Sequence, residues 1–254
     1  HPSMANNELS GPCVVTYLAR DIQMGVTKKN YYTYRIIFIP ETIGSIAYLS
    51  KNLDALKKNV IAGFNVTCVG DNRAYSYLPS RNGETLSDRV AKHVLQHIDP
   101  NYIRYGWQHR GSDERQYCAP GVDLPVASIM RTKYGEYPEY HTSLDDLVNV
   151  VTPDGLAGGF RALRAAIQAI ENNVYPKVTV LGEPQLGKRG LYPNLSTKRV
   201  RDRVMLMLNF ISWSDGSNSL LDIADRCGVP VWELYELVDV LKNNRLIEVV
   251  RCSQ

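Results

Sequence analysis

Strand-like and helix-like stretches alternate along the first two-thirds of the chain, and this alternation constrains the fold more than any other feature. Residues 60–71, VIAGFNVTCVGD, form a nearly continuous apolar run, which is typical of a buried strand. Residues 85–99, TLSDRVAKHVLQHID, carry apolar side chains at helical spacing after a Thr or Ser that can serve as N-cap. A buried strand followed by an amphipathic helix predicts an α/β protein.

Other stretches continue this alternation over the first 175 residues. Three more have apolar side chains at helical spacing and are predicted as helices, namely residues 11–23, 43–52 and 153–173. Three others are rich in aromatic and β-branched residues and are predicted as strands, namely residues 31–40, 102–107 and 124–131. The pattern as a whole predicts a sheet that is covered by helices on both faces.

The character of the sequence changes after residue 175. Residues 176–200 contain Gly, Pro and charged residues without periodicity, which predicts a linker. Residues 201–254 then show two helical stretches, a turn with glycine, a third helical stretch and a strand-like end, an order typical of a winged helix-turn-helix. We therefore expect a first domain over residues 1–175, a linker over 176–200 and a small module over 201–254.

Composition narrows the classes of protein to which the chain can belong. The 29 basic and 26 acidic residues give a net charge of +3, without the basic stripe of a nucleic-acid-binding protein. No apolar run approaches the length of about 18 residues that a membrane helix needs. The five cysteines are scattered and odd in number, which favours reduced thiols and a cytoplasmic location. Sixteen tyrosines against four phenylalanines predict half-buried rings that line a cleft.

The helix-turn-helix pattern does not by itself predict DNA binding. The second helix of the motif, residues 231–244, carries its polar side chains mainly at Glu233, Glu236 and Asp239. Phosphates repel carboxylates, and no arginine near the start of this helix could reach a guanine edge. We interpret the module as a docking element for its own chain or for another subunit, which is compatible with a homo-oligomer.

Acidic residues and histidines lie beside predicted turns in four short stretches, namely HPSMANNELSG, FIPETIG, CVGD and EYHTSLDD. In three of them the polar residue lies at or just after a strand end, where open α/β sheets bind ligands. Histidines from the first and last stretches, with carboxylates from the middle two, form a donor set that suits zinc. Zinc lowers the pKa of its bound water to about 7, and a free carboxylate can then act as general base.

In this order the four stretches resemble the metal site of zinc-dependent aminopeptidases of the bacterial leucyl-aminopeptidase type. The ANNELSG turn and the HTSLDDL stretch are the most specific matches. With the winged helix, they make the chain most similar to bacterial proteins that have an aminopeptidase-like domain and are often assigned to polysaccharide biosynthesis. The resemblance implies a mixed, mostly parallel sheet with helices on both faces, and a chain that lacks an N-terminal part of its relatives.

The resemblance also implies roles for individual residues. His1, Asp71 and His141 correspond to metal ligands. Glu41, in IPETIG, corresponds to the catalytic base. Asp145 follows His141 closely and would hold His141 in position without binding the metal itself. The GSDERQY stretch resembles a segment beside the substrate pocket, which implies substrate contacts for four residues of this region, namely His109, Asp113, Glu114 and Arg115.

Two departures from the family pattern leave alternatives open. Asn7 stands where the relatives have an aspartate that bridges two zinc ions. A neutral amide cannot bridge the ions in this way, so Asn7 would support the metal ligands without binding the metal. Thr42 stands where they have a second glutamate after Glu41, so Glu41 is either the base or a metal ligand. Either Glu8 replaces the bridging carboxylate as a metal ligand, or the site holds one metal ion, or it holds none.

The sequence therefore predicts a zinc-dependent hydrolase of peptide or amide bonds that uses one or two zinc ions. Its expected substrate is a small peptide or another amide-containing molecule. Two alternatives stand beside this prediction. One is a single-metal cyclase or acyltransferase on the same fold, and the other is a non-catalytic binding protein whose metal site has decayed.

Overall fold

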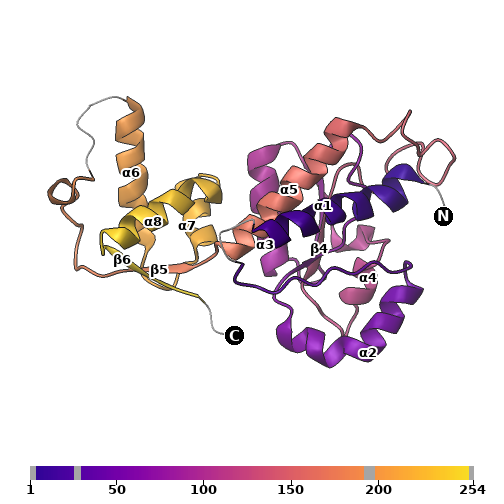
Figure 1. Cartoon of the computed structure of the whole chain (residues 1–254), viewed down its shortest axis with the longest axis horizontal. Coiled ribbons are helices and arrows are strands. Elements are labelled where there is room, and N and C mark those ends of the chain that lie inside the picture. Colours follow the sequence, from indigo (N-terminus) through magenta and orange to yellow (C-terminus); the bar gives the residue numbers. More distant parts are fainter. Residues whose placement is uncertain (1–3, 26–29, 192–197, 252–254) are drawn as a thin grey trace. The chain divides into compact units, whose positions relative to one another are not determined.

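The computed structural model describes residues 4–25, 30–191 and 198–251, and it divides into two compact units (Figure 1). Unit 1 covers His1–Glu171 and unit 2 covers Asn172–Gln254. Each unit buries an apolar core of its own. None of the helices formed by the described residues combines the length and the apolar character that a membrane crossing requires.

The helices of unit 1 lie close to the stretches with helical spacing. They are η1 (Ala5–Leu9), α1 (Ser10–Met24), α2 (Ile43–Asn59), α3 (Leu86–Ile98), η2 (Trp107–His109), α4 (Glu114–Tyr117) and α5 (Pro153–Glu171). At the start of α3, the backbone N–H of Thr85 donates to the carboxylate of Asp88, and the hydroxyl of Thr85 accepts from the N–H of Asp88. This capping box explains why α3 begins where it does.

The sheet of unit 1 has the order β1-β4-β2-β3. Its strands are β1 (Gly63–Phe64), β2 (Ser76–Leu78), β3 (Ile103–Arg104) and β4 (Val126–Met130). β4 is parallel to β1 and antiparallel to β2, and β2 is parallel to β3. The prediction of a mixed, mostly parallel sheet is confirmed.

Helices cover this sheet on both faces. Leu49 of α2 and Cys118, which directly follows α4, share a buried cluster with Val126 of β4. α3 and α5 also contact β4. In Figure 1, α2 lies on one side of β4, and α1 and α5 lie on the other. The sheet is therefore buried between helices, as the alternating sequence predicts.

Helix α5 packs directly against the backbone at the end of the apolar run 60–71. A Cβ atom at Gly155 would overlap with the carbonyl oxygen of Gly70, and one at Gly159 would overlap with that of Val69. The two glycines are therefore required by close approach of the helix to the chain. This contact fixes the turn that carries Asp71.

Residues 31–40, which the sequence predicts as a strand, pair with none of the described strands. They run as a long irregular segment between α1 and α2 (Figure 1). Ile36 and Phe38 are exposed, whereas Ile37 and Ile39 are half-buried, so the segment keeps the alternation of a strand. The composition suits a strand, but a strand also needs a neighbouring backbone, and the described residues provide none here. The prediction is wrong for this segment.

Unit 2 is a winged helix, as predicted. Its helices are α6 (Lys198–Trp213), α7 (Leu220–Cys227), η4 (Val231–Leu234) and α8 (Tyr235–Asn243), with a short turn η3 (Gly187–Arg189) before them. β5 (Tyr175–Val178) and β6 (Ile247–Val250) pair antiparallel. β5 begins one residue before the interval 176–200 that was expected as a linker, so this interval contributes backbone to the module.

The exposed face of the second motif helix is acidic. Glu233, Glu236 and Asp239 all lie exposed on η4 and α8. Glu236 forms an ion pair with Arg203 of α6, with Nη2 and Oε2 3.2 Å apart. Acidic groups at these positions repel phosphates.

Candidate functional site

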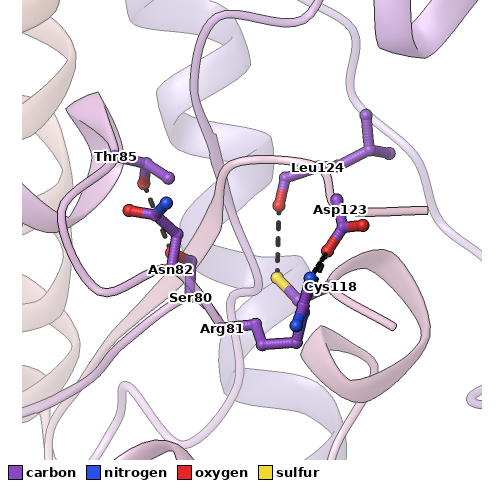
Figure 2. Close-up of a pocket in the computed structure, with 7 residues that line it drawn as sticks. All are labelled: Ser80, Arg81, Asn82, Thr85, Cys118, Asp123 and Leu124. Atoms are coloured by element: carbon purple, nitrogen blue, oxygen red, sulfur yellow. Dashed lines mark hydrogen bonds and ion pairs between the residues drawn. The ribbon is translucent and has the colours of Figure 1, made fainter. Parts of the chain in front are cut away.

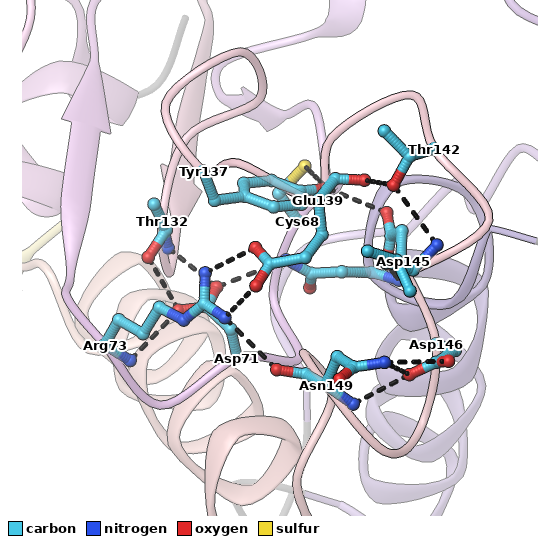
Figure 3. A network of polar contacts seen from close by, with 12 residues as sticks. Cys68, Asp71, Arg73, Thr132, Tyr137, Glu139, Thr142, Asp145, Asp146 and Asn149 are labelled. Atoms are coloured by element: carbon cyan, nitrogen blue, oxygen red, sulfur yellow. Dashed lines mark hydrogen bonds and ion pairs between the residues drawn. The ribbon is translucent and has the colours of Figure 1, made fainter.

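The carboxylate of Asp145 holds the ANNELSG turn in place. It accepts the backbone N–H of Asn6 at 2.7 Å and the N–H of Asn7 at 3.1 Å. It also accepts the hydroxyl of Tyr137 at 2.9 Å (Figure 3). Asp145 is 1% exposed. The first and last stretches singled out in the sequence therefore meet through one buried carboxylate, which fixes the position of Asn7.

Asp71, an expected metal ligand, is fully buried and bound within the protein. Its two oxygens accept the N–H of Thr132 at 2.8 Å, the hydroxyl of Thr132 at 2.6 Å, the N–H of Arg73 at 3.0 Å and the side-chain amide of Asn6 at 3.2 Å (Figure 3). These four hydrogen bonds use most of the acceptor capacity of a carboxylate. Asp71 therefore ties three segments together, and its oxygens do not face an open site.

Thr67 and Cys68, and not Asp71, lie beside Asn7. The hydroxyl of Thr67 donates to the carbonyl oxygen of Asn7 at 2.8 Å, and the sulfur of Cys68 is 3.8 Å from the side-chain oxygen of Asn7. The same sulfur is 3.9 Å from the hydroxyl of Tyr137. Burial raises the pKa of Cys68 to about 12, so its thiol is neutral at pH 7. Sequence analysis missed Thr67 and Cys68 because neither is a charged residue.

A second group of residues surrounds Glu41. The carboxylate of Asp113 accepts the backbone N–H of Thr42 at 2.8 Å. The guanidinium of Arg115 donates to the hydroxyl of Thr42 at 2.9 Å, and its Nη2 lies 3.9 Å from Oε1 of Glu41. Three of the predicted site residues, Glu41, Asp113 and Arg115, are therefore brought together.

The carboxyl group of Glu41 has a raised pKa. Partial burial is the main cause, and the negative charges of Asp113 and Glu8 also raise it. Arg115 and a hydrogen bond from Ser112 act in the opposite direction. The side chain of Glu41 is 45% exposed. A carboxylate that solvent can reach and that holds its proton more tightly than usual suits the role of a general base.

Glu114 is directed into the protein. It is fully buried, and Oε1 accepts the N–H of Gly111 at 2.7 Å, the N–H of Ser112 at 2.9 Å and the hydroxyl of Tyr134 at 2.6 Å. Oε2 accepts the side-chain amide of Asn65 at 2.9 Å. Glu114 therefore fixes the turn before α4, and the structure does not place it as a substrate contact.

Tyr140 links the two groups of residues. Burial raises the pKa of Tyr140 to about 12, and the negative charges of Glu41 and Glu8 also raise it, whereas Arg115 lowers it. Its ring stacks on that of His141, with centroids 3.9 Å apart. Tyr140 also packs against the buried cluster that contains Cys68. His141, an expected metal ligand, is thus placed at the edge of the same region.

Backbone strain gathers in this region. Among the described residues, five non-glycine residues have positive φ, and three of them belong here, namely Thr42 at 62°, Cys68 at 50° and His141 at 59°. Such conformations are costly for side chains with a Cβ atom, and they persist where the surrounding structure enforces them. They are a frequent mark of functional sites, so their clustering supports this region as the candidate site.

His109 is not brought to Glu41. Its ring lies 5.6 Å from that of Tyr105, and its Nδ1 is 3.3 Å from the carbonyl oxygen of Gly106. Tyr105 in turn packs on the buried cluster that contains Cys68. His109 therefore lies near an aromatic rim of the region and not beside the candidate base.

The donor set for zinc is incomplete among the described residues. No three His, Cys, Asp or Glu side chains within the described ranges are grouped so that they could hold a metal ion. Asp71 is occupied by hydrogen bonds, Asn7 is neutral, and the side chain of Glu8 accepts the amide of Asn7 at 3.1 Å. His1 lies outside the described residues. The described residues do not fit the zinc site that the resemblance implies.

A separate cavity of about 300 Å³ lies in unit 1 (Figure 2). Its lining residues are Ser80, Arg81, Asn82, Thr85, Cys118, Asp123 and Leu124. Arg81 and Asp123 form an ion pair across it, and the thiol of Cys118 donates to the carbonyl of Leu124. None of the predicted site residues lines this cavity.

Comparison with models of protein families identifies the family of the chain. The model of a domain of unknown function, DUF4910, matches residues 1–173, which is more than half of the chain. The chain belongs to the DUF4910 family. A model of winged helix-turn-helix domains matches residues 173–249. The junction of the two matches lies within two residues of the boundary between unit 1 and unit 2.

One relative of this DUF4910 protein comes from Clostridium acetobutylicum, and its name describes a candidate polysaccharide biosynthesis protein with an aminopeptidase-like domain. It is 40% identical over 254 residues, which cover 98% of this chain and 57% of the relative. The chain thus spans little more than half the length of this relative. The resemblance to aminopeptidase-like domains is confirmed.

Solved structures agree on the fold. A crystal structure of a candidate peptidase from Clostridium acetobutylicum has a TM-score of 0.88 and 38% identity, covering 98% of the DUF4910 protein and 55% of that chain. LapA from Legionella pneumophila has a TM-score of 0.50 at 18% identity, covering 66% of this chain and 48% of LapA. The second likeness shows the fold alone.

Proposed function

We propose that this DUF4910 protein contributes to an amide-bond hydrolase in which Glu41 is the general base. The observation that carries the proposal is the setting of Glu41, a half-exposed carboxylate with a raised pKa beside the guanidinium of Arg115. A base near a fixed cation is an arrangement that hydrolysis of a carbonyl compound needs. The aminopeptidase-like domain named for the Clostridium relative supports a peptide or another amide as substrate.

In the proposed reaction, Glu41 takes a proton from a water molecule as the water oxygen attacks the amide carbon. The carbonyl π electrons move to the oxygen, which becomes negative in the tetrahedral intermediate. When the intermediate collapses, the C–N bond breaks and Glu41 passes the proton to the leaving nitrogen. Water is consumed, a carboxylic acid and an amine are formed, and Glu41 returns to its charged form.

Zinc is not assigned a step in this reaction. A bound zinc ion would supply a Lewis acid and an activated water. The described residues, however, do not bring three suitable ligands together, and the carboxylate of Asp71 is already hydrogen-bonded within the protein. The proposed mechanism therefore depends on side chains of the chain itself.

The proposal is tested by replacing the base. We expect Glu41→Gln to reduce kcat for hydrolysis of leucine p-nitroanilide by about 10²–10⁴-fold, because general-base catalysis contributes that much. Glu84→Gln is the matched control, since Glu84 is exposed and pairs only with Lys92. Equal rates for wild type and Glu41→Gln would contradict the proposal.

A peptide with N-terminal glutamine separates hydrolysis from cyclisation. Hydrolysis releases free glutamine, whereas a cyclase releases ammonia and leaves a pyroglutamyl peptide. Mass spectrometry of the products distinguishes the two outcomes, because only cyclisation lowers the mass of the intact peptide. A cyclised product would replace the hydrolase proposal with the acyl-transfer alternative.

A further inference from the structure

The guanidinium of Arg115 has donors that the protein does not use. A guanidinium carries five N–H groups in a planar fork. Only Nη2 is engaged, by the hydroxyl of Thr42 at 2.9 Å and by the carboxylate of Glu41 at 3.9 Å. Among the described residues, Nη1 and Nε of Arg115 have no acceptor, and the side chain is 42% exposed. A half-exposed cation therefore presents free donors next to the candidate base.

The backbone around Arg115 is held rigidly. The carboxylate of Glu114, one residue earlier, is fully buried and accepts four hydrogen bonds. Asp113 accepts the N–H of Thr42 at 2.8 Å, which joins the turn before α4 to the turn before α2. The base and the cation are thus carried by two turns that are locked to each other. Such fixed placement is what electrostatic catalysis requires, because no reorganisation is then needed during the reaction.

We propose that Arg115 is a catalytic residue that donates hydrogen bonds from its free N–H groups to the oxyanion of the tetrahedral intermediate. This inference rests on the proposed hydrolysis and adds the group that stabilises its negative charge. Arg115 remains protonated throughout, since an arginine does not lose its proton in a protein. The proton of the attacking water passes through Glu41 alone, so the balance of the reaction is unchanged.

The charges around Arg115 favour this role over binding of an anionic substrate. Glu41 lies beside Arg115, and the negative charges of Asp113 and Glu8 both act on Glu41. This excess of negative charge around the base disfavours an anionic substrate in the ground state. When the oxyanion forms, Glu41 has just accepted a proton and is neutral. The negative charge has then moved from Glu41 to the oxyanion, and Arg115 can donate its hydrogen bonds there. Its interaction therefore strengthens as the intermediate forms, which is the condition for raising kcat.

Two substitutions test the role of Arg115 in catalysis. We expect Arg115→Gln to reduce kcat for leucine p-nitroanilide by about 10²–10³-fold, with KM within about twofold of wild type, because loss of one oxyanion donor has this effect. Arg115→Lys should recover part of the rate, since a lysine restores the charge without the fork. Arg81→Gln is the matched control, because Arg81 also pairs with a carboxylate but lies at the separate cavity. An unchanged kcat, or a raised KM with unchanged kcat, would overturn the inference.

Binding of an anionic tetrahedral probe tests the inference without any turnover. Phenylphosphonate resembles the intermediate in shape and charge, and its affinity can be measured by calorimetry. We expect Glu41→Gln to bind it at least as tightly as wild type, and Arg115→Gln to bind it at least tenfold more weakly. Equal affinity in wild type and Arg115→Gln would overturn the inference.

The probe also separates the two proposals. One outcome is that neither wild type nor Glu41→Gln hydrolyses the amide, but Arg115→Gln binds phenylphosphonate at least tenfold more weakly than wild type. In that case the proposed function fails and the oxyanion site at Arg115 stands.

Discussion

Glu41 owes its chemistry to neighbours that act in opposite directions. Partial burial and the charges of Asp113 and Glu8 raise the pKa of its carboxyl group, whereas Arg115 and Ser112 lower it. The net effect is a pKa above the usual value for glutamate. A general base must be deprotonated to act, so activity is lost as the pH falls through this raised pKa. The acid limb of the pH–rate profile therefore reports on Glu41.

Replacement of Asp113 by asparagine should move this acid limb. Asp113→Asn removes a negative charge that raises the pKa of Glu41, while the amide oxygen can still accept the N–H of Thr42. We expect the acid limb of kcat/KM to shift to lower pH in this variant. The profile of Asp123→Asn, whose carboxylate pairs with Arg81, should match wild type. A limb that stays in place or moves to higher pH would show that another group titrates.

At the scale of single residues, the sequence shows which residue types lie beside turns but not which of them are used up by hydrogen bonds. The sequence grouped Glu41, Asp113 and Arg115 in one region, and the structure brings them together. It could not distinguish these residues from Asp71 and Glu114, which are equally acidic and equally close to turns. Those two carboxylates are fully buried and each accept four hydrogen bonds, a difference that only tertiary contacts create.

At the scale of elements, the C-terminal end of α5 anchors the start of the segment 31–40. The carboxylate of Glu171 is 1% exposed and accepts the N–H of Tyr31 at 2.8 Å, the N–H of Tyr32 at 3.1 Å and the hydroxyl of Tyr34 at 2.6 Å. The same segment ends at the turn that carries Glu41. A contact at the end of one helix thus fixes the start of the chain that leads to the candidate base.

Removal of this anchor should loosen the segment. Glu171→Gln replaces one of the two acceptor oxygens by an NH₂ group. Since an NH₂ group cannot accept a hydrogen bond, at least one of the donors of Tyr31, Tyr32 and Tyr34 loses its acceptor. We expect a loss of about 1–3 kcal/mol in the free energy of unfolding, measured by urea denaturation. Hydrogen exchange of residues 31–34 should accelerate more than that of α3. Glu183→Gln, at an exposed position of unit 2, is the control.

The segment 31–40 also shows why some elements could not be predicted. The helices α1, α3 and α5 follow from apolar spacing, and α3 also from its capping box, which are local properties of the sequence. A strand depends in addition on a partner that can lie anywhere in the chain. Residues 31–40 have the composition and the alternating exposure of a strand, and they still join no sheet among the described residues.

At the scale of the whole molecule, the chain is two units, which divide between Glu171 and Asn172. The sequence interval 176–200 lacks periodicity, which favoured a linker. The structure instead begins unit 2 at Asn172 and uses Tyr175–Val178 as β5, paired with β6 near the end of the chain. A two-stranded ladder between residues so distant in sequence leaves no local signal, so the sequence could reveal the winged helix but not its first strand.

Unit 2 should fold without unit 1. Its core contains side chains at most 1% exposed from α6, α7, η4 and α8, namely Phe210, Leu220, Leu221, Ile223, Leu234 and Leu241. The ladder of β5 and β6 closes the module with contacts of its own. Both features are those of an independent domain. We therefore expect a fragment of residues 172–254 to unfold cooperatively in urea, monitored by circular dichroism.

The position of the boundary can be tested with a matched fragment. A fragment of residues 179–254 retains every helix of unit 2 but lacks β5, so β6 loses its partner backbone and its hydrogen bonds are left to solvent. We expect this shorter fragment to have a lower urea midpoint than 172–254 or to lose its cooperative transition. Equal midpoints for the two fragments would mean that β5 adds nothing to the module. The interval 176–200 would then behave as a linker, because its paired residues would contribute nothing to the free energy of unfolding.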